Sequence, residues 1–133
     1  MIKMFIDGAA NPKKDISGIG ILIIESKQQT QISEKLNSDY DNHEAEILAL
    51  HYALDYLLKT NKEKDVILCH SDSKMLVDAV EKRYSRKENH LALLQSIFKQ
   101  LEGFPHFYLK WIPEKENSGA DQLARKGMNK KKW

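Results

Sequence analysis

The hydrophobic pattern of the first 36 residues predicts three β-strands. The expected strands are residues 1–7, 18–25 and 30–36. Residues 8–17 contain the pair Asn11-Pro12 and are expected to form a loop. Because the connections are short, we expect these strands to pair antiparallel.

A helical pattern follows at residues 42–59, with Asp41 or Asn42 as its N-terminal cap. Its polar side chains share one face and are Glu44, His51, Asp55 and Lys59. Nearly all its other residues are apolar, so we expect the helix to be packed on more than one side. Residues 66–69 form a short apolar run that is typical of a strand buried on both faces. The pattern further predicts helices at 74–81 and 88–102, a strand at 106–112, and a last helix from about residue 117 or 118.

This order of elements predicts an α/β fold. We expect a five-stranded mixed sheet, three strands antiparallel and two parallel, with helices on both faces. Right-handed crossovers would place Asp7 and Asp72 at or just past the ends of parallel strands. Glu46 and Asp121 would then lie in the first turns of helices that begin at the same edge, where open α/β sheets bind ligands.

Length and composition favour one globular domain over residues 1–133, with a basic tail from about residue 126 to residue 133. The chain is 41% hydrophobic and 30% charged, and it shows no signal-peptide pattern and no apolar run of membrane-spanning length. We therefore expect a cytoplasmic monomer with no membrane contact and no obligate protein partner. Cys69 is the only cysteine, which excludes an internal disulfide and a thiolate zinc cluster.

The net charge of +2 permits a polyanionic partner without requiring one. Basic residues gather at two places, Lys82, Arg83, Arg86 and Lys87 in one short segment, and Arg125, Lys126, Lys130, Lys131 and Lys132 near the end. Taken alone, each cluster is best explained as a solvated surface.

Each of the four acids has an ordinary explanation when it is taken singly. Asp7-Gly8 could belong to a turn, and Asp72 could cap the helix that follows it. Asp121 could complete a capping box with Ser118. Glu46 resists such an explanation best, because it lies about 200° around the helix from Glu44 and should face inward.

A carboxylate on an apolar face is costly unless it is paired or bound to a cation. The helix has no lysine or arginine before Lys59, so a shared metal ion would resolve the cost for Glu46. Glu44, by contrast, can serve Asp41 as a capping partner. Oxygen ligands favour Mg²⁺ or Mn²⁺, and two such ions about 3.5–4 Å apart are the usual device for phosphoryl transfer. The residues thus indicate a metal-dependent phosphoryl-transfer site.

Four motifs, in order and over nearly the whole chain, resemble the ribonuclease H family. They are Phe5-Ile6-Asp7-Gly8-Ala9 with Asn11-Pro12 and Ser17-Gly18-Ile19-Gly20; Asn42-His43-Glu44-Ala45-Glu46; Ser71-Asp72-Ser73; and Trp111-Ile112-Pro113 with Asn117, Ala120-Asp121 and Leu123-Ala124. The resemblance implies a ribonuclease H-like fold and hydrolysis of the RNA strand of RNA/DNA hybrids with two Mg²⁺ ions, leaving 5′-phosphate and 3′-hydroxyl ends.

Carried over residue by residue, the resemblance implies that Asp7 bridges both ions and that Glu46 and Asp72 complete the first site. Asp121 would help to hold the ion that activates water. The implied substrate contacts are Gly8, Ala9, Asn42, Ser73 and Asn117, of which the first four would approach the minor groove, where 2′-hydroxyls distinguish RNA from DNA.

Two features depart from the family. Many members carry a histidine that aids proton transfer or product release three residues before the motif asparagine, and here Glu114 holds that place. Residues 82–87 are also short where some relatives insert a basic protrusion, which leaves Arg83, Arg86, Lys87 and the basic tail as phosphate contacts. The alternative to an active nuclease is therefore a catalytically weak or silent nucleic-acid-binding module of the same fold. Relatives of this fold with other substrates usually add domains, and a small-molecule enzyme has no motif here to support it.

Overall fold

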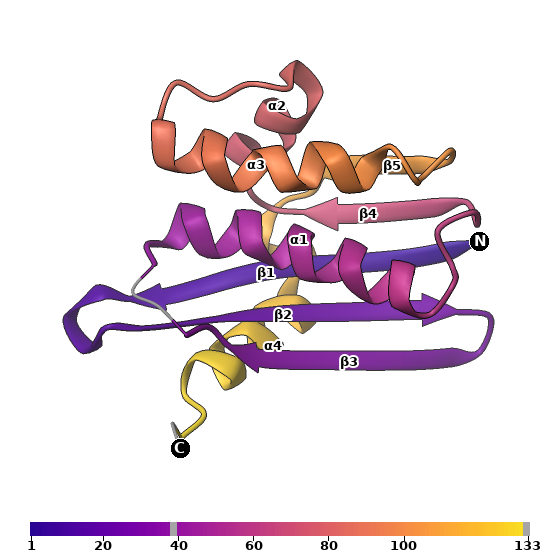
Figure 1. The fold of residues 1–133 in the computed structure, drawn as a ribbon. Coiled ribbons are helices and arrows are strands. Elements are labelled where there is room, and N and C mark those ends of the chain that lie inside the picture. Colours follow the sequence, from indigo (N-terminus) through magenta and orange to yellow (C-terminus); the bar gives the residue numbers. More distant parts are fainter. Residues whose placement is uncertain (38–39, 132–133) are drawn as a thin grey trace.

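A five-stranded sheet in the order β3-β2-β1-β4-β5 forms the centre of the structure, a computed structural model that describes residues 1–37 and 40–131 (Figure 1). The strands are β1 (Ile2–Asn11), β2 (Ile16–Glu25), β3 (Gln28–Lys35), β4 (Ile67–Ser71) and β5 (Phe107–Trp111). β1, β2 and β3 pair antiparallel, whereas β4 pairs parallel with both β1 and β5. The predicted fold class is confirmed.

The described residues contain four helices. They are α1 (Asn42–Lys59), α2 (Lys74–Lys82), α3 (Glu88–Leu101) and α4 (Ser118–Met128), and two short 3-10 turns are η1 (Pro12–Lys14) and η2 (Glu114–Glu116). Of these helices, α1, α2 and α4 pack against the sheet and α3 packs against α1. In Figure 1, α1 crosses the sheet in front of β1, and α4 lies behind β2. No helix in the described ranges 1–37 and 40–131 is long and apolar enough to cross a membrane.

The packing of α1 agrees with its predicted central position. Its fully or nearly buried residues are Ala45, Ile47, Ala49, Leu50, Ala53, Leu54 and Leu57, and the helix contacts β1, β2 and α3. The side chain of Asp41 accepts a hydrogen bond from the amide of Glu44, and the side chain of Glu44 accepts one from the amide of Asp41. The predicted capping box is confirmed, and it accounts for Glu44 without a metal.

The predicted loop over residues 8–17 is wrong for most of its length. β1 continues to Asn11 and β2 begins at Ile16, and the ladder between them is unbroken from Gly8–Ile19 to Asn11–Ile16. The small residues of this stretch lack strong strand propensity, but backbone pairing in the hairpin overrides that weakness. The turn is confined to η1 and Asp15, which has a left-handed φ of 53°.

Asp7 consequently lies inside β1 and not at its end. The parallel ladder with β4 stops at the pair Ile6–Ser71, so Asp7 is the first residue of β1 beyond it. Asp72 is likewise the first residue after β4. The two acids therefore lie next to the C-terminal end of β4, where β1 continues without a parallel neighbour. The end of β4 leaves room for a site at that edge.

Candidate active site

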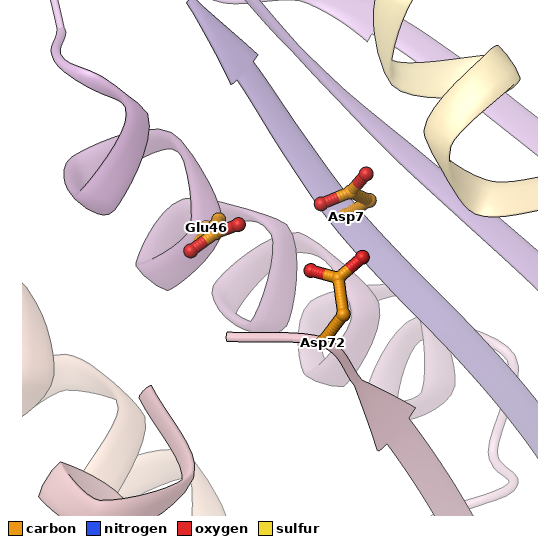
Figure 2. Close-up of side chains that lie close together, drawn as sticks. All are labelled: Asp7, Glu46 and Asp72. Atoms are coloured by element: carbon orange, nitrogen blue, oxygen red, sulfur yellow. The ribbon is translucent and has the colours of Figure 1, made fainter. Parts of the chain in front are cut away.

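Three carboxylates from distant parts of the chain converge beyond the end of β4. Asp7, Glu46 and Asp72 each offer one oxygen atom, and these atoms all lie within 4.8 Å of one another. Figure 2 shows the three side chains reaching toward a common point from β1, α1 and the segment after β4. Glu46 is therefore directed into the group of acids and not toward bulk solvent.

Gly8 brings α1 close enough for Glu46 to reach Asp7. A Cβ atom at Gly8 would lie 2.3 Å from the carbonyl carbon of Ala45 and 2.4 Å from the amide nitrogen of Glu46. Real Cβ contacts do not occur at such distances, so only glycine permits this approach of helix to strand. The residue expected to contact substrate thus also sets the position of a carboxylate.

Asn117 and Trp111 hold Asp72. The side-chain amide of Asn117 donates to Oδ2 of Asp72 at 3.3 Å and to the carbonyl of Ile6 at 2.9 Å. Nε1 of Trp111 donates to the main-chain carbonyl of Asp72 at 3.2 Å. Asn117 is only 1% exposed and its side-chain amide bonds to protein groups, so its observed contacts are those of a positioning residue.

The ordinary explanation for Asp72, a helix cap, is wrong. Ser73 is the cap of α2, and its hydroxyl accepts a hydrogen bond from the amide of Leu76 at 3.1 Å. Asp72 takes no part in capping because its carboxylate is turned toward Asn117 and the other acids.

Burial and mutual repulsion raise the pKa values of the three acids. Burial first, and then the charges of Asp72 and Glu46, raise the pKa of Asp7 to about 8, against a smaller lowering by the amide of Gly8. Burial also raises the pKa of Glu46 to about 7, opposed by hydrogen bonding from Ser73, and it is the largest cause of the raised pKa of Asp72.

Three clustered carboxylates cannot all carry charge at neutral pH without a compensating cation. Their donor atoms are hard oxygens, which suit Mg²⁺ or Mn²⁺. The chemistry and spacing of these residues therefore fit a divalent metal ion.

Asp121 and Glu114 line the same cavity, which has a volume of about 850 Å³. Both oxygens of Asp121 instead contact Nε of Arg125, at 3.1 and 3.2 Å, and Asp121 is not one of the three converging acids. The capping-box explanation for Asp121 is not seen, because α4 has no side-chain cap. Glu114 is exposed on η2, and its charge adds to the raised pKa of Glu46 and of Asp72.

The other residues predicted to contact substrate divide into two groups. Gly8, Ala9, Asn42 and Ser73 line the cavity of the acids. Oδ1 of Asn42 accepts a hydrogen bond from the amide of Ala10 at 2.9 Å, which fixes its side chain at the cavity edge. Arg83, Arg86 and Lys87 do not line this cavity; Arg83 lies over the ring of Phe98, 5.5 Å from its centroid.

Sequence reasoning missed several residues that line the cavity, namely Pro12, Lys13, His43, Lys74, Met75 and Arg125 as a neighbour of Asp121. Lys74 directly follows the motif Ser71-Asp72-Ser73, and His43 lies inside the motif that contains Glu46. Adjacency to the motifs was therefore an available signal for both. Lys13 also follows a motif pair, Asn11-Pro12, but its place at the cavity depends on the full length of the hairpin, which the sequence did not predict.

A sheet of this order, with carboxylates on β1, on α1 and just after β4, defines a ribonuclease H-like protein. The profile of the family described as reverse transcriptase-like matches residues 5–127, and the chain belongs to this family. The connection between α2 and α3, residues 83–87, holds no inserted protrusion.

Relatives agree with this assignment. The chain is 35% identical over 133 residues to the Enterococcus faecalis protein named "Putative hydrolase EbsB", covering 98% of this chain and 96% of that one. The structure of the N-terminal ribonuclease H domain of rv2228c from Mycobacterium tuberculosis superposes with a TM-score of 0.82 at 21% identity, over 96% of this chain and 98% of that one. LC11-RNase H1 in complex with an RNA/DNA hybrid superposes with a TM-score of 0.80 at 23% identity, over 97% of each chain. At these identities the structures establish the fold.

Proposed function

We propose that this protein is a metal-dependent endoribonuclease that cleaves the RNA strand of RNA/DNA hybrids and leaves 5′-phosphate and 3′-hydroxyl ends. The observation that carries the proposal is the approach of oxygen atoms of Asp7, Glu46 and Asp72 to within 4.8 Å of one another in a cavity that all three residues line. Membership of the family, a relative named as a hydrolase and a structural neighbour that binds a hybrid support it.

In this proposal Asp7, Glu46 and Asp72 would hold one Mg²⁺ or Mn²⁺ ion, and Asp7 and Asp121 would help to hold a second. When bound, such a pair of ions supplies Lewis acidity both for attack by water on phosphorus and for departure of the 3′ oxygen. Asn117 holds Asp72 in place through the bond from its side-chain amide. Gly8 keeps Glu46 within reach of Asp7.

The cavity edge also offers groups that could recognise RNA. Asn42, Ser73, Gly8 and Ala9 line the cavity, and we propose that the side chains of the first two and the main chain of the last two contact 2′-hydroxyls of the RNA strand. Ser73 is 6% exposed, so its contact would require the substrate to enter the cavity.

Cleavage of labelled substrates tests the proposal directly. RNA/DNA hybrid, duplex RNA and duplex DNA are incubated with Mg²⁺ or Mn²⁺ and with the protein, its Asp72→Asn variant and a matched Asp78→Asn control. Asp78 is also partly exposed, lies on α2 and does not line the cavity. We expect cutting of the hybrid alone, its loss in Asp72→Asn and its retention in Asp78→Asn. Hybrid cutting that survives in Asp72→Asn would refute the proposal.

A second candidate function, a silent nucleic-acid-binding module, is favoured by the carboxylate at Glu114. An exposed acid there repels phosphate, whereas a protonated imidazole would attract it. Tight hybrid binding without cutting would support this module. If Glu114 handles protons, Glu114→His should change turnover more than metal affinity; unchanged turnover would remove Glu114 from the catalytic residues.

A further inference from the structure

Arg125 is paired with Asp121 in the cavity of the converging acids. Its Nε lies 3.1 and 3.2 Å from the two oxygens of Asp121, and both side chains line the cavity of the converging acids. Only Nε is engaged: within residues 1–37 and 40–131, the terminal guanidinium nitrogens of Arg125 have no hydrogen-bond partner. The pair therefore places a carboxylate beside a guanidinium group whose terminal N–H groups remain able to donate hydrogen bonds.

The pair could be an ordinary contact between successive turns of α4. Exposed pairs at this spacing contribute only about 0.3–0.5 kcal/mol, and the Arg125 side chain is 66% exposed. Because the pair is weak, replacing Arg125 by another cation beside Asp121 would cost little free energy. What distinguishes this pair is its position, because the cavity that it lines has a volume of about 850 Å³ and holds further carboxylates.

We propose that Arg125 is a resident counter-ion that keeps Asp121 from accepting a metal ion until a nucleic-acid phosphate draws the guanidinium away. Arginine binds phosphate through two parallel hydrogen bonds, which are stronger than one Nε contact to a carboxylate. Without nucleic acid, the protein then holds one ion at Asp7, Glu46 and Asp72. The second ion binds only when substrate does, so substrate and metal favour each other's binding. This inference rests on the proposed function.

Two binding measurements test it, and neither depends on turnover. In the first, Mn²⁺ is titrated calorimetrically, without nucleic acid, into the wild type, Arg125→Gln, Arg125→Lys and Lys126→Gln. Lys126 is an exposed residue of α4 next in sequence, so its variant removes the same charge without touching Asp121. We expect one bound ion per chain in the wild type, Lys126→Gln and Arg125→Lys, and two bound ions per chain in Arg125→Gln.

In the second measurement, hybrid binding is followed in EDTA by fluorescence anisotropy. Arg125→Gln should bind the hybrid more weakly than the wild type, because it has lost the phosphate contact. A purely structural role for Arg125 would weaken both kinds of binding or neither, whereas the inference requires opposite changes. Circular dichroism confirms that each variant is folded.

The failures are distinguishable. If the wild type binds no Mn²⁺, or Asp7→Asn binds as much as the wild type, the proposed metal site fails and the function with it. If the wild type binds two ions without nucleic acid, or if Arg125→Gln binds Mn²⁺ as the wild type does, only the role of Arg125 is overturned.

Discussion

Asp7 is the most strongly perturbed acid of the site. It is 6% exposed and has Glu46 and Asp72 beside it, so its charged form is disfavoured both by lost solvation and by like charge. These two effects have opposite consequences for folding and for metal binding. They make the metal-free protein less stable when Asp7 is ionised. They also make the binding of a cation at Asp7 more favourable in free energy.

Replacing Asp7 by asparagine should stabilise the metal-free protein at high pH. Burial raises the pKa of Asp7 from 3.8 to about 8, so the folded state keeps a proton that the unfolded state releases between these values. Stability is therefore lost as pH rises toward 8, and the whole penalty is present above it. With EDTA at pH 9, we expect Asp7→Asn to unfold in urea with a free energy roughly 2–5 kcal/mol higher than that of the wild type, and no gain at pH 4.

Added Mg²⁺ should reverse this order at pH 9, because it stabilises only a chain that can bind it. Asp65→Asn, a change at an exposed position outside the cavity, serves as the control and should follow the wild type at every pH. Equal stabilities of Asp7→Asn and the wild type at pH 9 in EDTA would contradict the expected repulsion among the acids.

Asn117 shows why a residue can belong to a recognised motif and still have an unforeseen role. The motif marked Asn117 as a site residue. Only the structure shows that its side-chain amide donates both to the carbonyl of Ile6 and to the carboxylate of Asp72. These partners are 111 and 45 residues away along the chain. No local pattern encodes contacts over such separations.

Removal of the Asn117 amide should weaken metal binding. Groups that orient a metal ligand typically change affinity 10- to 100-fold, and a lost buried hydrogen bond costs about 1–3 kcal/mol. We expect Asn117→Ala to lower Mn²⁺ affinity about ten-fold in a calorimetric titration and to lower the free energy of unfolding by roughly 1–3 kcal/mol. Asn89→Ala, which removes an exposed amide that donates to Glu44, is the control. Loss of stability with unchanged Mn²⁺ affinity would show that Asn117 serves the fold alone.

At the scale of elements, periodicity predicted what each segment is, and small residues decide how closely the segments approach. The apolar faces of α1 and the run at β4 were readable because burial follows helix and strand periods. The extension of β1 through Gly8 could not be predicted from the sequence, because glycine and alanine have low strand propensity. On the opposite face of the sheet, a Cβ atom at Gly20 of β2 would lie 2.3 Å from the amide nitrogen of Ala124. The close packing of α4 on β2 therefore also requires a glycine, as the packing of α1 on β1 does.

Substitution of Gly8 should therefore separate α1 from β1. The added methyl group would meet main-chain atoms of Ala45 and Glu46, which cannot move as a flexible side chain could. We expect Gly8→Ala to cost about 3 kcal/mol or more in the free energy of unfolding and to reduce Mn²⁺ binding, because Glu46 is displaced. In Gly103→Ala the new atom would come no closer than 3.5 Å to its surroundings, so stability should hardly change. Urea unfolding of both variants measures these free energies. Similar small losses of stability in the two variants would show that α1 tolerates displacement.

At the scale of the whole molecule, charge is arranged around the cavity in a way that a count of charges cannot reveal. Five carboxylates and the basic residues Lys13, Lys74 and Arg125 line one hollow, although the chain carries a net charge of only +2. The sequence showed basic residues gathered at 82–87, where Arg83, Arg86 and Lys87 are exposed. It could not show which face they occupy, because that depends on how α2 and α3 pack.

Two hypotheses for phosphate binding follow from this arrangement, and salt dependence separates them. If phosphate contacts are made at the cavity rim, Lys13→Ala with Lys74→Ala should reduce the slope of log affinity against log salt by about two, since each lost contact removes about one. Arg86→Ala with Lys87→Ala removes the same charge away from the cavity and should leave the slope unchanged. Hybrid binding in EDTA, measured by anisotropy between about 50 and 200 mM salt, gives both slopes. A larger loss in the second double variant would instead place the hybrid along the segment between α2 and α3, as the family resemblance implied.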